Sequence, residues 1–246
     1  ALAGILAMVF GPLSCRNKIE SINFGAIPSG SAVLIYIAQD RHYFADHGVS
    51  VHIKDYATGV GTIDALLRGD VDIAWAAEFP LVKRAFHKDD ISIIAALSRF
   101  SDQYLFGRKD RGIRQRSDLK AKKIGIPRHT ISEFYLARFL DLNGMDMREV
   151  DLVNVLPPQS LKALTSGKVD GVVTWEPYSS RIKVQLADKV TAWPVQNSQP
   201  GYGVIIGRND WIKKHSDLIQ RFLKSLVLAE GFLVRDPDAA KGILKK

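Results

Sequence analysis

Cysteine is almost absent from this 246-residue sequence, which contains only Cys15. A single cysteine cannot form an internal disulfide, and it cannot build a metal site that needs several thiolates. Charged residues make up 24% of the chain and apolar residues make up 46%. These are the proportions of an ordinary folded globular protein, and they argue against both a disordered chain and a protein with many membrane spans. The length suits one large domain or two modest ones.

Motifs of several enzyme classes are also missing. The chain has no Gly-x-Ser-x-Gly, no Gly-x-x-x-x-Gly-Lys-Ser/Thr and no His-Glu-x-x-His, which are signatures of hydrolases, P-loop nucleotide-binding proteins and zinc proteases. The six histidines are scattered. His42 and His47, at an expected helix end, are spaced poorly for two metal ligands on one helix face. The sequence therefore predicts no catalytic residue, no metal and no cofactor, and a protein that is not an enzyme.

Positive charge is in excess but is not concentrated. Lysine and arginine total 34 against 26 acidic residues, and the net charge of +8 favours anionic partners. The densest basic stretch, residues 108–123 (RKDRGIRQRSDLKAKK), also contains aspartates and is typical of a solvated surface. The chain has neither zinc-finger spacing nor an aromatic-rich RNA-binding signature. We therefore expect no nucleic-acid partner.

The start of the chain predicts an exported protein. Residues 1–14 (ALAGILAMVFGPLS) are uncharged and almost wholly apolar. They are too few for a membrane-spanning helix of about 20 residues, but they suit the apolar region of a secretory signal. Cys15 follows directly, after the small residue Ser14, and resembles the acylated cysteine of bacterial lipoproteins. The two residues before Ser14 fit that pattern poorly, so an ordinary signal with an incidental cysteine stays open. We expect residues 1–18 to be a leader and tether.

Two stretches of the chain repeat one pattern. Residues 65–75 (ALLRGDVDIAW) and 163–175 (ALTSGKVDGVVTW) share Ala-Leu-x-x-Gly-x-Val-Asp and both reach a tryptophan after a short apolar run. Pro28 and Pro127 stand at nearly the same offset. The surrounding pattern also repeats in the order strand, helix, strand, helix, strand. The expected strands are residues 21–27, 49–56, 70–76, 122–126, 150–156 and 168–175, and the expected helices are 28–48, 57–69, 128–144 and 157–167.

The repeat predicts two lobes of like topology. Strands that alternate with helices imply right-handed crossovers and sheets covered on both faces. The chain is expected to pass between the lobes near Phe106 and near Val204. Lobe one would then be discontinuous, with residues 19–107 and 207–246, and lobe two would be residues 108–206. The cleft between two such lobes is the natural place for a ligand.

The second half carries motifs of a known family. They are Asp-Leu-Lys before the strand Lys-Ile-Gly-Ile, the step Gly-Lys-Val-Asp, and Trp-Glu-Pro-Tyr at residues 175–178. In their order and spacing they resemble the solute-binding proteins of nitrate/sulfonate/taurine-type ABC transporters, over about residues 22–234. The resemblance implies the α/β, two-lobe type II periplasmic-binding-protein fold, in which each lobe is a mainly parallel sheet flanked by helices and two hinge crossovers join the lobes.

Candidate ligand-binding residues lie where strands turn into helices, because the backbone N–H groups at a helix N-terminus attract negative charge. Hydroxyl and glycine residues precede the first two helices, and Thr130-x-x-Glu133 forms a capping box before the third. Trp75 and Trp175 end matching strands, and we expect Trp75 to pack in the core. The predicted binding residues are Ser29, Gly30, Thr58, Gly59, Ala77, Glu78, Phe79, Arg99, Arg128, His129, Thr130, Trp175, Glu176 and Tyr202.

The charges among these candidates leave the ligand open. Arg99, Arg128 and His129 favour an anion, whereas Glu78 and Glu176 favour an amine or another hydrogen-bond donor. An aminosulfonate reconciles the two sets, while nitrate alone is poorly served by unpaired carboxylates. A pyrimidine that carries an amine, as in the family branch that binds a thiamine precursor, is the alternative; it would stack on the aromatic residues.

The sequence thus predicts an extracytoplasmic receptor of an ABC importer. It would bind a small organic anion such as an alkanesulfonate or taurine, or else nitrate, in the cleft and deliver it to a membrane permease. The resemblance makes the permease the partner, and we expect the receptor to be a monomer, with a possible lipid anchor on Cys15. An enzyme or a sensor domain on the same fold is the less favoured alternative, because the exported N-terminus argues against both.

Overall fold

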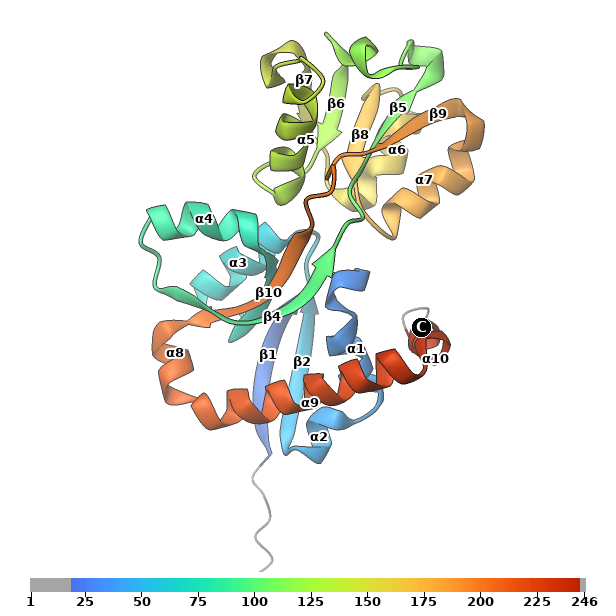
Figure 1. Ribbon diagram of the computed structural model, residues 1–246. Coiled ribbons are helices and arrows are strands. Elements are labelled where there is room, and N and C mark those ends of the chain that lie inside the picture. Colours follow the sequence, from blue (N-terminus) through green and yellow to red (C-terminus); the bar gives the residue numbers. More distant parts are fainter. Residues whose placement is uncertain (1–18, 244–246) are drawn as a thin grey trace, which may run out of the picture.

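The computed structural model describes residues 19–243, which form two lobes, one above the other in Figure 1. Each lobe contains a five-stranded sheet with helices packed against it. The expected leader and Cys15 lie outside the described residues. Within the described part of the chain no helix is both long enough and apolar enough to span a membrane.

The sheet of lobe one has the strand order β2-β1-β3-β10-β4. β1 runs parallel to β2 and β3, so that Glu20 pairs with Val49, whereas β10 runs antiparallel to both of its neighbours. The expected mainly parallel sheet is therefore a mixed one. The strands are β1 (Glu20–Ala26), β2 (Val49–Asp55), β3 (Ile73–Ala77), β4 (Ile91–Phe100) and β10 (Gly201–Arg208).

The two faces of this sheet bury separate apolar clusters because side chains alternate along each strand. On one face Phe24 of β1 stacks with Phe222, whose ring also stacks on Phe44 at 5.2 Å between ring centroids. On the other face Ile63 and Leu66 are fully buried. The helices of lobe one are η1 (Gly30–Ala32), α1 (Val33–Asp40), α2 (Tyr43–Asp46), α3 (Gly59–Arg68), α4 (Glu78–Phe86), α8 (Asn209–Lys214), α9 (Ser216–Arg235) and α10 (Pro237–Ile243).

The prediction of one continuous first helix is wrong. The sequence pattern predicts one helix over residues 28–48, but the structure has η1, α1 and α2 in its place. The break lies at His42, which has the left-handed backbone conformation with φ of 61°. A residue in that conformation cannot continue a right-handed helix. Apolar periodicity does not reveal such a break, because Phe44 beyond it is still buried.

Lobe two repeats the arrangement with the strand order β7-β6-β8-β5-β9. β6 is parallel to β7 and β8, and β5 is antiparallel to β8 and β9. The strands are β5 (Tyr104–Arg108), β6 (Lys123–Ile126), β7 (Asp151–Asn154), β8 (Gly171–Thr174) and β9 (Val190–Pro194). The helices are η2 (Lys109–Arg111), η3 (Arg116–Leu119), α5 (Ile131–Asp141), η4 (Met147–Glu149), η5 (Pro157–Gln159), α6 (Ser160–Thr165), α7 (Tyr178–Leu186) and η6 (Ala187–Lys189).

The two strand orders confirm the internal repeat. β1, α1, β2, α3 and β3 of lobe one correspond to β6, α5, β7, α6 and β8 of lobe two, and each set is completed by an antiparallel strand beside its third strand. The repeated sequence stretches therefore hold the same position in each lobe: a short helix, a turn, and the strand at the centre of the sheet.

The passages between the lobes lie a few residues from where the sequence places them. β5, which contains Phe106, is already part of the second sheet, and β10, which contains Val204, is already part of the first. The chain therefore crosses at residues 101–103 and returns at residues 195–200 (Figure 1). The expected boundaries at residues 107/108 and 206/207 fall at or near the far ends of these strands. Both stretches are extended, and an extended segment that joins two lobes has the same sequence character as a strand that pairs within a sheet.

Candidate functional site

A pocket lies between the lobes beside the two crossovers. Its empty space is about 400 Å³, including the part that is open to solvent. Both lobes and the first crossover contribute side chains, and we call this space the inner pocket. It is lined by Ile27, Ser31, Gly59, Val60, Trp75, Ala77, Pro80, Phe100, Asp102, Gln103, Thr130, Ile131 and Trp175.

The N-termini of three helices meet at the inner pocket. Gly59 and Val60 begin α3, Ala77 is the N-cap of α4, and Thr130 is the N-cap of α5. The first N–H groups of a helix have no partner within it, and the helix dipole places partial positive charge there. Three helix starts at one pocket therefore favour an anionic group without a basic side chain.

Local sequence explains why these helices begin where they do. The hydroxyl of Thr58 accepts a hydrogen bond from the amide of Gly61 at 3.2 Å, which caps α3. The hydroxyl of Thr130 accepts from the amide of Ser132 at 3.3 Å and donates to the carbonyl of Pro127 at 2.8 Å. Both caps use a hydroxyl just after the strand, and they leave the adjacent helix start facing the pocket.

Aromatic side chains form much of the pocket wall. The rings of Trp75 and Phe100 lie 6.5 Å apart between centroids, and Trp175 approaches from lobe two. Trp75 is only 3% exposed and also belongs to the core, as the sequence predicts. Its indole nitrogen is buried and has no hydrogen-bond partner among the described residues. A Cβ on Gly203 would lie 2.5 Å from both this nitrogen and the hydroxyl of Ser98, so the indole N–H points toward β10.

Of the described residues that line the inner pocket, Asp102 alone carries a charge. Burial raises the pKa of this carboxyl above its ordinary value, hydrogen bonds such as that from the backbone amide of Glu176 oppose the rise, and the negative charge of Glu176 adds to it. The two carboxylates thus lie close enough to interact. A positively charged or N–H-bearing group of a ligand would be stabilised beside them.

Glu176 itself sits at the start of α7, just after the strand that ends near Trp175. Its carboxylate accepts a hydrogen bond from the amide of Ser180 at 3.1 Å. Partial burial alone would raise the pKa of Glu176, but hydrogen bonds from the first turn of α7 and the charge of Lys183 lower it below the ordinary value. Glu176 is therefore held ionised next to Asp102.

Two buried glutamines join the crossovers to each other and to lobe two. The amide of Gln103 donates to the side-chain oxygen of Gln196 at 3.1 Å, and the amide of Val195 donates to the carbonyl of Gln103 at 3.1 Å. The side-chain nitrogen of Gln196 donates to the carbonyl of Phe100 at 3.0 Å. Arg138 of α5 donates to the carbonyl of Gln196 at 3.2 Å. These bonds hold the two crossovers side by side behind the pocket.

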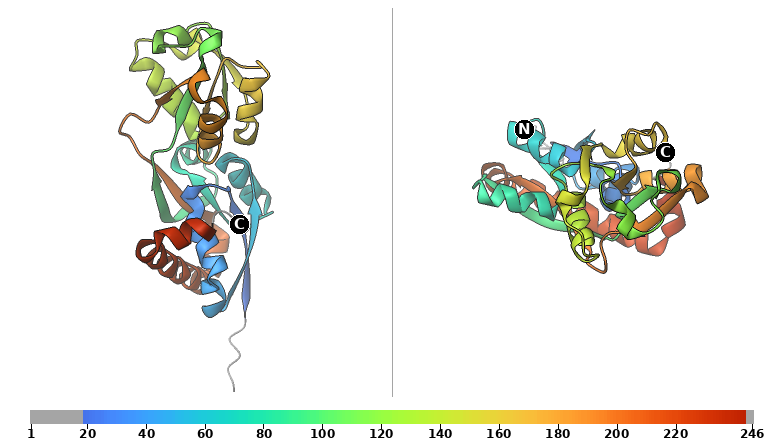
Figure 2. Two further views of the ribbon diagram at one scale, coloured as in Figure 1. Left: turned by 90° about the vertical axis from the view of Figure 1, so that its right-hand side faces the viewer. Right: turned by 90° about the horizontal axis from the view of Figure 1, so that it is seen from above.

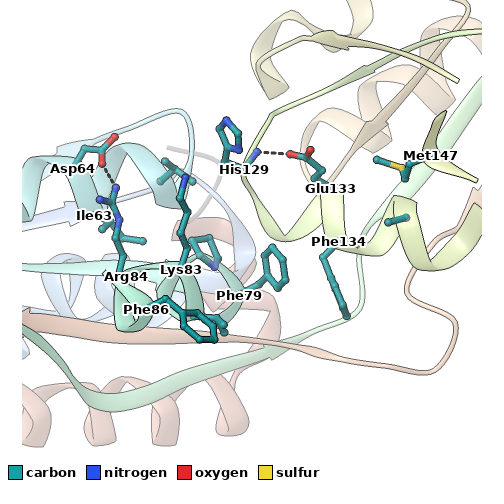
Figure 3. A pocket seen from close by; sticks show the side chains of 14 residues that line it. Ile63, Asp64, Phe79, Lys83, Arg84, Phe86, His129, Glu133, Phe134 and Met147 are labelled. Atoms are coloured by element: carbon teal, nitrogen blue, oxygen red, sulfur yellow. Dashed lines mark hydrogen bonds and ion pairs between the residues drawn. The ribbon is translucent and has the colours of Figure 1, made fainter. Parts of the chain in front are cut away.

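A second, larger hollow adjoins the first between α4 and α5, and we call it the outer groove (Figure 3). Its empty space is about 1510 Å³, including the part open to solvent. Phe79 of α4 stacks on Phe134 of α5 at 4.9 Å between centroids, so the groove is bridged by a contact between the lobes. It is lined by Val60, Ile63, Asp64, Phe79, Pro80, Val82, Lys83, Arg84, Phe86, His129, Glu133, Phe134, Ala137 and Met147.

The structure brings six of the fourteen predicted binding residues to these two spaces. Gly59, Ala77, Thr130 and Trp175 line the inner pocket. Phe79 and His129 line the outer groove.

The other eight lie elsewhere. Ser29 does not cap a helix, because its hydroxyl is bonded to that of Ser31 at 2.7 Å. Gly30 has no atom within 4 Å of the position a Cβ would occupy. Glu78 accepts a hydrogen bond from the amide of Tyr202 at 2.8 Å, and this pair ties α4 to β10. None of these four predicted residues lines the inner pocket, and neither does Thr58, the N-cap of α3.

The predicted cations are also absent from the inner pocket wall. Arg99 is an exposed residue of the edge strand β4. Arg128 forms an ion pair with Glu133 at 3.1 Å. The expected capping box is shifted as well, because the carboxylate of Glu133 accepts the amide of His129 and not that of the N-cap Thr130. The carboxylate that the sequence pattern assigns to the helix cap thus neutralises the neighbouring guanidinium.

The sequence interpretation missed Asp102 and Phe100. Phe100 is the last residue of β4, directly after Arg99, and Asp102 lies two residues further on, in the first crossover. Alternation along an extended strand places Phe100 and Asp102 on the side opposite Arg99. This alternation would have predicted that Phe100 and Asp102 face the cleft, but only if the crossover had been placed at residues 101–103. Three further lining residues, Ser31, Val60 and Pro80, lie in the first turns of helices, so they could be predicted once those helix starts are known to face the cleft.

A family model described as "NMT1/THI5 like" matches residues 31–240. The chain belongs to this family. Among similar proteins, the taurine-binding periplasmic protein of Escherichia coli (strain K12) is 25% identical over 227 residues, which cover 90% of this chain and 69% of that protein. The formylaminopyrimidine-binding protein of Halalkalibacterium halodurans is 22% identical over 222 residues, which cover 88% of this chain and 67% of that protein.

A solved structure shows the same fold for this NMT1/THI5-like chain. The alkanesulfonate-binding protein SsuA from Xanthomonas axonopodis pv. citri, bound to MOPS, superimposes with a TM-score of 0.81 at 17% identity. The match covers 92% of this chain and 78% of that one. The two-lobe α/β fold predicted from the sequence and the resemblance to taurine- and sulfonate-type binding proteins are therefore both confirmed.

Proposed function

We propose that this protein is the extracytoplasmic ligand-binding receptor of an ABC importer and that it binds a small aminosulfonate of the taurine type in the inner pocket. The observation that carries the proposal is the meeting of three helix N-termini with one carboxylate, Asp102, in a pocket between two lobes. The relatives that bind taurine and alkanesulfonates support the ligand class.

The distribution of charge favours a ligand with both signs. An anionic head would accept hydrogen bonds from those backbone amides at the starts of α3, α4 and α5 that the hydroxyls of Thr58 and Thr130 do not already bind. An ammonium group would then face Asp102, with Glu176 behind it. Nitrate has no donor group to offer these carboxylates, so its binding would bring like charges together at a partly desolvated site.

Closure of the lobes about the crossovers would give the transporter a signal that ligand is bound. In this proposal, ligand contacts from both lobes favour the closed arrangement, and a membrane permease recognises it. The mature receptor acts as a monomer outside the cytoplasm. A lipid on Cys15 would hold it at the membrane surface. The receptor binds and releases its ligand without chemical change.

An amine-bearing pyrimidine is the second candidate, and the aromatic wall favours it. Trp75, Phe100 and Trp175 could stack on a flat ring, and Asp102 could accept a hydrogen bond from its amino group. The relative from Halalkalibacterium halodurans, a formylaminopyrimidine-binding protein, supports this reading. The two candidates differ in what they require: a pyrimidine needs the rings, whereas an aminosulfonate needs the helix starts.

A ligand panel tests the proposal. The protein from Arg16 onward is heated with taurine, ethanesulfonate, nitrate or a 4-aminopyrimidine, each at a saturating concentration. A ligand at 100 times its dissociation constant adds about 2.7 kcal/mol to the free energy of unfolding. For a chain of this size the midpoint of thermal unfolding then rises by about 5–10 °C. We expect the largest rise with taurine; a rise with the pyrimidine alone would replace the first candidate by the second, and no rise with any of the four would refute both.

A further inference from the structure

The positive charge of the protein is gathered in lobe two. Lobe two, residues 104–194, contains 16 basic and 10 acidic residues, whereas the described part of lobe one, residues 19–100 and 201–243, contains 14 and 15. One segment, residues 108–123, holds eight of the basic residues and two of the acidic ones, which equals the whole excess of lobe two. The fold therefore has one basic lobe and one nearly neutral lobe.

The basic segment lies at the end of lobe two that faces away from lobe one. η2 and η3, which belong to it, are drawn in green at the top of Figure 1 and of the left view of Figure 2. The carboxyl ends of β6 and β8 lead to Thr130 and Trp175 in the inner pocket, so the amino ends of these parallel strands lie at the opposite end. The charge at this end is therefore remote from the candidate ligand site.

The other strands of the sheet add basic residues to the same end, which we call the basic end. Arg108 ends β5 and Lys123 begins β6. Arg148, Lys168 and Lys189 lie just before β7, β8 and β9. Since β5 runs antiparallel to β8 and β9, it finishes where they start. Every strand of lobe two thus places a cation at the basic end.

A separate hollow opens at the basic end. Its empty space is about 1300 Å³, including the part open to solvent. Its charged side chains are Arg108, Lys109, Arg114 and Lys189 with Asp110 and Asp188. Arg108 pairs with Asp110, so three cations and Asp188 remain without an ion pair among the described residues. The hollow therefore offers an excess of positive charge to a phosphate group.

Carboxylates offset the cations of the basic end only in part. Glu149 pairs with Lys120 at 2.7 Å, and Asp146 pairs with Arg148 at 2.9 Å. Of the eleven basic residues in segment 108–123 and before β7, β8 and β9, eight form no ion pair with a described residue. The carboxylates without an ion pair there are Asp118, Asp141, Asp151, Asp170 and Asp188. Two of them, Asp118 and Asp170, accept bonds from backbone amides and are held close to the chain, whereas lysine and arginine extend into solvent.

The basic end lacks the apolar centre that a protein partner needs. Ile113 and Leu119, the two large apolar residues of segment 108–123, are fully buried. Leu142 and Val184, also in lobe two, are exposed singly, which is ordinary for a protein surface. Stable protein interfaces are built around aromatic and apolar side chains and are poor in lysine. An anionic lipid surface, by contrast, attracts clusters of lysine and arginine through charge alone.

On these grounds we propose that the basic end of lobe two binds the anionic lipid head groups of the membrane. The contact needs neither the transported ligand nor a lipid on Cys15. It rests on the proposed function only for the location outside the cytoplasm. It would orient a receptor that works beside a membrane permease, with lobe two held at the lipid surface.

Vesicle sedimentation tests the contact. The protein from Arg16 onward is mixed with vesicles of phosphatidylcholine alone, or of equal parts phosphatidylcholine and phosphatidylglycerol, in about 0.1 M salt, where the screening length is about 10 Å. We expect binding only to the vesicles that contain phosphatidylglycerol. Binding should be lost in about 1 M salt, where charges are screened beyond about 3 Å.

A variant that lacks the unpaired cations of the hollow locates the contact. It combines Lys109→Gln, Arg114→Gln and Lys189→Gln, and none of these three side chains forms a hydrogen bond or ion pair with another described residue, so the fold should be retained. Each lysine or arginine held near an anionic surface tightens binding about fivefold. The triple variant should therefore bind the phosphatidylglycerol vesicles about 100-fold more weakly.

A control variant with the same net charge separates the basic end from the charge of the whole chain. It combines Lys213→Gln, Lys224→Gln and Arg235→Gln, which removes three exposed cations of lobe one. These positions are screened from a membrane at the basic end, so binding should stay within about twofold of that of the unchanged protein. Equal losses in the two triple variants would assign the binding to total charge and overturn the proposal.

The remaining outcomes separate the membrane contact from the proposed function. Equal binding to both kinds of vesicle, or binding to neither, would overturn the contact with anionic lipid. The rise in unfolding temperature with taurine is measured in the same proteins and should be equal in all three, because the basic end is remote from the inner pocket. Absence of that rise in the unchanged protein would contradict the proposed ligand and leave the vesicle result to decide the membrane contact.

Discussion

Replacing Asp102 with asparagine removes one negative charge from the inner pocket while the side chain keeps its size. A hydrogen bond to a charged group contributes about 1.5–3 kcal/mol. If the ammonium of taurine faces this carboxylate, Asp102→Asn should weaken taurine binding about 10- to 150-fold. Ethanesulfonate has the same skeleton without the amine, so its affinity should stay the same or improve.

Titration calorimetry measures four affinities: the unchanged protein and Asp102→Asn, each with taurine and with ethanesulfonate. They form a double-mutant cycle, since one change removes the carboxylate and the other removes the amine. The difference between the two losses is the free energy of the amine–carboxylate contact. Acidification provides a second test. The raised pKa of Asp102 predicts that taurine affinity falls with decreasing pH before an ordinary aspartate would be protonated. An equal loss of affinity for taurine and for ethanesulfonate would refute the placement of the amine at Asp102.

Asp102→Asn should weaken taurine binding but raise the stability of the ligand-free protein. Burial is the main cause of the raised pKa, so the folded ligand-free protein favours the protonated carboxyl. The stability that this group contributes is present at pH values below its pKa in the unfolded chain, about 3.9, and is lost as the pH rises through the higher pKa of the folded state. At pH 7 Asp102→Asn should therefore unfold at a higher temperature than the unchanged protein without ligand. The difference should disappear near pH 3.5.

Two further substitutions probe the walls of the cleft. Gly203→Ala would place a Cβ 2.5 Å from the indole nitrogen of Trp75. This overpacking should lower the free energy of unfolding by about 1–3 kcal/mol and weaken ligand binding, as measured by thermal unfolding and calorimetry. Gly30→Ala is the control: no atom lies within 4 Å of its new Cβ, so neither stability nor binding should change. Phe79→Ala removes the ring contact between the lobes, which is worth about 0.5–1.5 kcal/mol. Without this contact the lobes should separate, so the radius of gyration of the ligand-free protein in small-angle scattering should increase. Ligand binding should weaken about 2- to 13-fold, because the closed arrangement loses that free energy. Phe134→Ala should have the same effect, and adding it to Phe79→Ala should cause little more; additive effects would contradict a shared contact.

Much of the fold could be predicted because its signals are local and occur twice. Gly69 and Gly167 end α3 and α6 at matching points of the repeat, and both have the left-handed backbone conformation, with φ of 81° and 72°. Glycine adopts that conformation without strain, and so it marks a helix end that the sequence alone reveals. The order of strands and helices then follows from short apolar runs between such marks.

The candidate site could be predicted only in part, because its geometry depends on long-range pairing. The helix starts at Gly59 and Thr130 follow from local capping. The position of Asp102 depends on which sheet takes up each of the two extended strands, and no periodicity in the sequence decides that. The ion pair of Arg128 with Glu133 also lies beyond sequence pattern, since the same carboxylate would serve equally well as a helix cap.

The route of the chain also bears on how the protein is made. Lobe two is one unbroken segment, from β5 to β9, whereas the sheet of lobe one has β10 between β3 and β4. As the chain is synthesised or exported, lobe two can complete its sheet while β3 still lacks its antiparallel neighbour. The apolar strand Ile73–Ala77 (IAWAA) is then an open edge until β10 arrives. Mispairing with another chain, or capture by a chaperone, should therefore begin at this strand.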